Sequence, residues 1–79
     1  MDTVEFALFK YKYIEGILKG WRASEFDTSR YKCGTVEAYI KYDIKNDTAK
    51  LYIFDILMAE CKIKELPRIL KEQKLYEEK

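Results

Sequence analysis

Asp55 is the residue whose position in the sequence most suggests chemistry. It falls within the apolar segment 51–58, where alternation predicts that its side chain shares a face with hydrophobic residues. Desolvation on such a face raises the pKa of a carboxylate, and such carboxylates are enriched at functional sites. The alternative is a structural carboxylate bonded to a lysine, an arginine or a tyrosine hydroxyl. Asp55 is therefore the candidate buried carboxylate.

The chain contains no histidine, which removes the commonest general base. Ser-His-Asp and Cys-His arrangements are therefore excluded. The three glycines, Gly16, Gly20 and Gly34, do not form a phosphate-binding loop. We assign no catalytic residue, and we expect a protein that is not an enzyme and that uses neither a metal nor another cofactor.

Glu60-Cys61-Lys62, with aspartates earlier in the chain, resembles the Glu-x-Lys half of the PD-(D/E)xK nuclease motif. In that family the Asp and the Glu hold Mg²⁺ and the Lys assists the attacking water. On the hairpin predicted below, Asp43 and Asp47 lie at the turn and Glu60 lies at the open end. At about 3.3 Å per residue they would be ~20 Å or more apart, too far to share a metal.

A β-hairpin over about residues 35–58 is the element that must position these groups. Residues 36–44 alternate between apolar and polar, which is typical of a half-buried strand. Residues 45–50 have turn chemistry, and 51–58 are rich in β-branched and aromatic residues. A two-residue turn at Asn46-Asp47 and a four-residue turn both keep the same residues on the buried face.

The other face of this hairpin is too apolar for a plain solvent-facing sheet. Three roles remain open: a helix packs over it, a protein binds it, or nucleobases stack on its rings. Glu37 and Asp43 on the same face, and a net charge of +1, weigh against nucleic acid. The candidate interface residues are Tyr39, Lys41, Tyr52 and Phe54, together with Trp21.

Helices are predicted on both sides of the hairpin. Residues 3–22 have a broad apolar helical face in which Lys10 is the one misplaced charge, and its stem can snorkel. A hairpin that turns at Glu15-Gly16 is the alternative for this segment. The C-terminal helix is predicted over about 66–77, with Pro67 in its first turn. The connection over 23–34 is polar and contains either a helical turn or a short strand.

The segment Tyr13–Trp21 has the form Tyr-x-x-x-Ile-Leu-x-x-Trp. It resembles the terminal helix motif of DnaD-type replication proteins. In that family the motif ends a helical domain implicated in DNA binding and primosome assembly, so the resemblance implies a DNA-binding accessory protein related to replication. The chain departs from the pattern at Glu25, where the family usually has Gly, and the β-hairpin does not belong to that domain.

The two cysteines flank the predicted hairpin. Cys33 precedes its first strand and Cys61 follows its second, so the hairpin would bring them close together at its open end. They are either two reduced thiols, as is usual in the cytosol, or a disulfide that closes the base of the hairpin. Two cysteines without a histidine are too few for a zinc site within one chain.

The composition is that of a small globular protein: 79 residues, 48% hydrophobic and 37% charged. We therefore expect one α+β domain over 1–79, cytoplasmic, with no signal peptide and no membrane partner. The function predicted is a non-enzymatic protein-interaction module, of the kind that a phage or mobile element encodes as a regulator or inhibitor of a host protein. Its partner is another protein or a second copy in a homodimer, and nucleic acid is the alternative.

Overall fold

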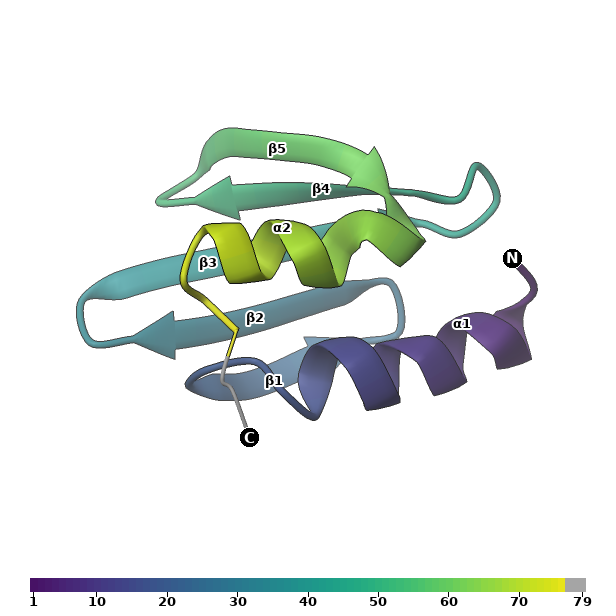
Figure 1. Ribbon diagram of the computed structural model, residues 1–79, viewed down its shortest axis with the longest axis horizontal. Coiled ribbons are helices and arrows are strands. Elements are labelled where there is room, and N and C mark those ends of the chain that lie inside the picture. Colours follow the sequence, from purple (N-terminus) through teal and green to yellow (C-terminus); the bar gives the residue numbers. More distant parts are fainter. Residues whose placement is uncertain (77–79) are drawn as a thin grey trace.

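The chain folds into two layers, a five-stranded antiparallel sheet and a layer of helices over one of its faces (Figure 1). The computed structural model describes residues 1–76, without the side chains of Ala23 and Ser24. Each strand pairs with the next one in the sequence, so the sheet is a meander whose edges are β1 and β5. The strands are β1 (Trp21–Glu25), β2 (Thr28–Cys33), β3 (Val36–Asp43), β4 (Thr48–Ile53) and β5 (Ile56–Lys62). The α+β class is confirmed, but the sheet has more strands than the one predicted hairpin.

The β3–β4 hairpin follows the alternation in the sequence. Tyr42 pairs with Ala49 and Ile40 pairs with Leu51, which is the register of a four-residue turn over 44–47. These four side chains are buried on the helix-covered face, whereas their sequence neighbours point to the other face. The predicted division of this hairpin into an apolar and a second face is therefore confirmed.

A second tight turn interrupts the predicted return strand 51–58. Phe54 and Asp55 both have positive φ, 51° and 64°, and they link β4 to β5 with Ile53 opposite Ile56. Positive φ at both central residues is typical of the two-residue turns that match the twist of a hairpin. The usual Asn-Gly signal is absent, so the sequence pattern did not reveal this turn. The prediction of one strand through Met58 is wrong.

The N-terminal helix is shorter than the predicted 3–22. It runs as α1 (Thr3–Phe9) and continues as a π-helical segment, η1 (Lys10–Glu15). The alternative hairpin at Glu15-Gly16 is not found. The helical segment ends at Glu15, and position 20 requires a glycine, because its φ is +69° and a Cβ there would collide with the carbonyl oxygen of Lys32 on the neighbouring strand.

The C-terminal helix is likewise shorter than the predicted 66–77. A 3-10 turn, η2 (Ile63–Glu65), leads into α2 (Leu66–Glu72), which has Pro67 in its first turn as expected. Position 77 lies outside the described residues. After α2 the chain returns to the N-terminal segment, where the Lys19 amide donates to the Leu75 carbonyl at 3.0 Å.

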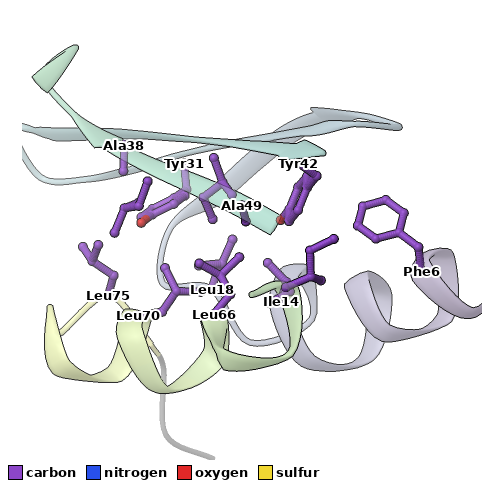
Figure 2. Packing of buried hydrophobic residues seen from close by; sticks show 13 residues of the cluster. Phe6, Ile14, Leu18, Tyr31, Ala38, Tyr42, Ala49, Leu66, Leu70 and Leu75 are labelled. Carbon is purple, nitrogen blue, oxygen red and sulfur yellow. The ribbon is translucent and has the colours of Figure 1, made fainter. Parts of the chain in front are cut away.

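The core lies between the two layers, and both helices point their apolar side chains at the same face of the sheet (Figure 2). Among the fully buried side chains are Phe6, Ile14, Ile40, Leu51, Ile63, Leu66 and Leu70. Among residues 1–76, no helix lies on the opposite face of the sheet (Figure 1); we refer to it as the open face. Within residues 1–76, no helix combines the length and apolar character that crossing a membrane requires.

Lys10 is buried within this core, with 5% of its surface exposed, so it does not snorkel to solvent. Its ammonium donates to the backbone carbonyls of Glu25, Phe26 (3.0 Å) and Thr28 (2.8 Å), and it lies 3.1 Å from a carboxylate oxygen of Glu15. A buried cation is tolerated when it is paired and hydrogen-bonded in this way. Lys10 thus joins the N-terminal helix to the β1–β2 turn.

Candidate functional site

A tyrosine pair lies at the centre of the open face. Tyr39 on β3 and Tyr52 on β4 are direct register partners, and their ring centroids are 6.1 Å apart at an interplanar angle of 46°. Both side chains are only half-buried, because no helix within residues 1–76 covers them. Of the roles left open by the sequence, burial under a helix is thereby excluded.

Arg30 extends this aromatic centre onto β2. It is the register partner of Tyr39, and its guanidinium carbon lies 4.9 Å from the centroid of that ring. A cation over an aromatic face at this distance is attracted by the ring quadrupole. The stacked guanidinium covers part of Tyr39 and keeps its N–H donors in solvent.

Ion pairs border the centre on two sides. Lys32 and Glu37 are 3.7 Å apart across β2 and β3, and Lys50 and Glu60 are 3.7 Å apart across β4 and β5. All four side chains are exposed, so each pair contributes little to stability. Further along, Asn46 holds the pKa of Asp43 below its usual value through hydrogen bonds to the carboxylate. The border is therefore charged but nearly neutral in sum.

The open face is hollowed beside the tyrosine pair. The hollow measures about 500 Å³, and a shallower one of about 320 Å³ adjoins it beside Lys41. The larger hollow combines three rings with three cations and two carboxylates: Tyr39, Tyr52 and Phe54; Arg22, Arg30 and Lys32; Glu37 and Asp55. The hollow therefore offers a bound molecule both aromatic surface and charged groups of either sign.

An apolar rim lies at the β4–β5 turn and the start of β5; Phe54 also lines the larger hollow, whereas Ile56 pairs with Ile53 on the covered side. Phe54, Ile56, Leu57 and Met58 are 55%, 63%, 50% and 48% exposed. Leu57 is the register partner of Tyr52, and a β-bulge follows it. Proteins usually protect the edge strands of their sheets with charged residues or with a covering element. Hydrophobic side chains that remain exposed together on an edge strand are therefore typical of contact sites.

The structure brings most of the predicted interface residues together. Tyr39, Lys41 and Tyr52 share the open face, and Phe54 stands at its rim. Trp21 is separate, because its register partner Tyr31 has its side chain in the core on the covered face. Sequence reasoning missed Arg22, Arg30 and Leu57, and the one available signal was the short strand left as an alternative within 23–34.

Asp55 is not buried. The prediction that it lies among apolar residues is wrong, because it occupies the second position of the β4–β5 turn and is exposed. Its carboxylate borders both hollows instead. Asp55, a charged residue within an apolar segment, marks the position of this turn.

Of the two alternatives for the cysteines, the disulfide is not found, and both thiols are free. Cys33 pairs with Val36, while Cys61 pairs with Ala49, which itself pairs with Tyr42. Val36 and Tyr42 are at opposite ends of β3, a separation of about 20 Å at 3.3 Å per residue. Burial raises the pKa of the Cys61 thiol, and the nearby Glu65 adds to this.

The fold-back of β5 also changes the surroundings of the Glu60-x-Lys62 segment. Asp43 pairs with Thr48, and Thr48 pairs with Lys62, so the segment lies beside the Asp43–Asp47 turn rather than ~20 Å away as predicted from strand spacing. Even so, residues 1–76 contain no group of three or more acidic or cysteine side chains placed to hold a metal ion.

Comparisons with protein-family models, with curated protein sequences and with solved structures found no match to this chain. The resemblance of Tyr13–Trp21 to DnaD-type proteins stays a prediction. In the structure this segment is helical only through Glu15, and Trp21 begins β1.

Proposed function

We propose that the chain is a protein-binding module and that the open face, with its tyrosine pair and apolar rim, is the surface that contacts the partner. The observation that carries this proposal is the uncovered centre formed by Tyr39, Tyr52 and Arg30. Tyrosine and arginine are enriched among the residues that dominate interface energies, and such centres are typically surrounded by a polar rim.

The backbone of Phe54 supports the same role. A bulky residue with a φ of 51° is strained, and its side chain is exposed, so burial does not compensate for that strain. Asn or Gly would suit this turn position better. The turn requires positive φ at this position but not a phenylalanine, and strained residues are enriched at functional sites, where the side chain has another use. Contact with a partner is that use here.

A nucleic-acid partner is less well supported. Arg22, Arg30 and Lys41 could meet phosphates, and the tyrosines could stack bases. However, the carboxylates of Glu37, Asp43, Asp55 and Glu60 border the same face, and the chain has a net charge of only +1. A partner protein with both charged and apolar groups fits this surface better. Regulation or inhibition of that protein by covering its surface is the role that suits so small a module.

The test is a pair of matched variants in a capture experiment from the cells that encode the chain. The Y39A/Y52A variant removes the centre, and Y11A removes an exposed tyrosine on the helix layer instead. We expect the same protein to be retained by wild type and Y11A, in low and in high salt, and to be lost with Y39A/Y52A. Circular dichroism checks that each variant is folded.

Two results contradict the proposal. One is capture of the same protein by wild type and Y39A/Y52A in equal amounts. The other is binding of a single-stranded DNA oligonucleotide, followed by fluorescence anisotropy, that weakens steeply with salt and requires the tyrosines. The second result would favour the DNA-binding alternative.

A further inference from the structure

The outer edge of β5 exposes backbone groups at Glu60 and Lys62. The amide of Ile63 donates to the carbonyl of Asp47 at 3.2 Å, and this fixes which β5 residues bond to β4. Because bonded and non-bonded positions alternate in an antiparallel pair, Cys61 and Ala59 also face β4. Glu60 and Lys62 therefore direct their N–H and C=O groups away from the sheet. No described element lies along this edge (Figure 1).

The side chains at these two positions carry opposite charges on the same face. Glu60 is the register partner of Lys50 and Lys62 that of Thr48, so both side chains lie on the open face. An antiparallel strand that bonds to this edge must place its own bonding residues opposite Glu60 and Lys62. The best complement has a cation opposite Glu60 and an anion opposite Lys62.

A second copy of β5 provides this complement in one register only. With a two-fold axis at Cys61, the Glu60 of each copy lies opposite the Lys62 of the other copy. The contact therefore contains two such pairs. A shift by one bonding step in either direction places Glu60 opposite Glu60, or Lys62 opposite Lys62, and like charges directly opposite are destabilising. In this register Ala59 would lie opposite Ile63, which already belongs to η2, so the paired segment is Glu60–Lys62 and the contact is short.

We propose that two copies of this chain pair antiparallel through β5 about a two-fold axis at Cys61, which joins their two sheets into one. Each Glu60–Lys62 pair exchanges two backbone hydrogen bonds and forms an ion pair between copies. The two open faces then become a single continuous surface. This proposal does not depend on the binding role of the open face, because neither Tyr39 nor Tyr52 takes part.

The first experiment reverses one charge at a time. In a dimer of E60K both pairs consist of two lysines, and in a dimer of K62E both pairs consist of two glutamates, so each variant alone repels itself. An equimolar mixture of the two restores both opposite-charge pairs. We expect light scattering over micromolar to millimolar concentrations to show dimer for wild type and for the mixture, with self-association at least about tenfold weaker for either variant alone.

The second experiment separates the backbone from the charge. E60P removes the outward N–H, whereas the matched E60A keeps it and loses the same carboxylate. We expect E60P to remain monomeric at concentrations where E60A retains part of the wild-type dimer. Circular dichroism establishes whether both variants are folded. If E60P does not fold, the comparison of E60K, K62E and their mixture decides whether β5 forms the dimer contact.

The third experiment uses Cys61 as a reporter. At the axis the two Cys61 Cα atoms would be about 4.5 Å apart, the spacing of a non-hydrogen-bonded pair, which lies within the range for a disulfide. Diamide takes up two electrons and two protons as two thiols form the bond, and alkaline solution is needed because the pKa of Cys61 is raised. We expect C33S to form a covalent dimer on a non-reducing gel, C61S to form none, and C33S/E60K to react at least about tenfold more slowly.

A wild-type chain that is monomeric throughout this range contradicts the proposal. So does self-association that is equal in wild type, E60K and K62E, or crosslinking of C33S that is unaffected by E60K. Loss of partner capture in Y39A/Y52A without any change in dimerisation leaves this proposal intact, so the two proposals fail separately.

Discussion

Each face of the sheet has a cation above an aromatic ring, and the two cations differ in every other respect. Lys10 lies over Tyr42 on the covered face, 5.2 Å from the ring centroid, and is surrounded by oxygen acceptors. Arg30 lies over Tyr39 on the open face at 4.9 Å and has no ion-pair partner among the described residues. One cation is fully satisfied within the fold, and the other keeps its donors available.

This difference separates the face whose side chains hold the fold together from the face whose side chains are left uncovered. On the covered face, Tyr42 hydrogen-bonds to Ser29 at 2.9 Å, Ser29 donates to Glu15 at 3.2 Å, and Glu15 pairs with Lys10. Every member of this network depends on the others. On the open face, Tyr39, Tyr52 and Arg30 contact one another and solvent. Substitutions on the two faces should therefore have opposite consequences.

The largest effect is expected from K10M. Methionine keeps much of the volume, but it leaves the Glu15 carboxylate, which is only 17% exposed, without its cation and removes the donor to three carbonyls. We expect a loss of about 4 kcal/mol in the free energy of unfolding, as when one partner of a buried pair is removed. The matched K41M on the open face should change it by less than about 0.5 kcal/mol. Urea denaturation measures both, and similar values for the two would remove the distinction between the faces.

The neighbours Leu51 and Tyr52 give the next comparison. L51A creates a cavity in the core and should cost about 3 kcal/mol. Y52A removes a half-buried ring from the open face and should cost less than half of that, while it weakens partner capture. A Y52A variant as unstable as L51A would mean that the tyrosine pair serves the fold.

A smaller effect is expected from S29A. The substitution removes a fully buried hydroxyl that donates to Glu15 and bonds to Tyr42. We expect a loss of about 1.5 kcal/mol by urea denaturation, the cost of leaving a buried polar group without its partner. T48A, which removes a hydroxyl on the open face at the first residue of β4, serves as the control. No change in S29A would show that the network is not connected as described.

The smallest effect at neutral pH concerns the buried tyrosines. Burial raises the pKa of Tyr31 and of Tyr42 above the ordinary value of 10.0, and the charge of Glu15 adds to the shift at Tyr42. Because the folded state favours the protonated phenol, the stability from these groups is complete below about pH 10 and is lost as the pH rises from there. We expect absorbance at 295 nm to report their ionisation together with unfolding. Ionisation of all tyrosines near pH 10 in a folded chain would contradict this.

The parts of the fold that follow periodicity could be predicted from the sequence. The alternation through Val36–Asp43 established the buried face of β3, and with it the shared face of Tyr39, Lys41 and Tyr52. Pro67 correctly indicated the first turn of α2. These elements are local, and their side-chain patterns reflect burial directly.

The rest could not be predicted, because it depends on backbone conformations that the residue types do not favour. Phe54-Asp55 adopts a turn usually made by Asn-Gly, and this one turn changed the positions expected for Asp55, Cys61 and Glu60. Lys10 looked like a surface residue on an apolar helix. Its acceptors come from the β1–β2 turn, which is distant in the sequence, so its burial was not visible there.

The meander has a consequence for how the chain reaches its structure. Every strand pairs with its immediate neighbour in sequence, so the sheet can form by successive hairpins without closing a long loop. Contacts between the two ends of the chain, such as those of Leu18 with Tyr76 and of Lys19 with Leu75, span far greater separations in sequence. We therefore expect rapid folding in which the sheet and α1 assemble early and the C-terminal segment docks last. The tyrosine pair of the open face, which comes from two neighbouring strands, would then be in place before the C-terminal segment docks.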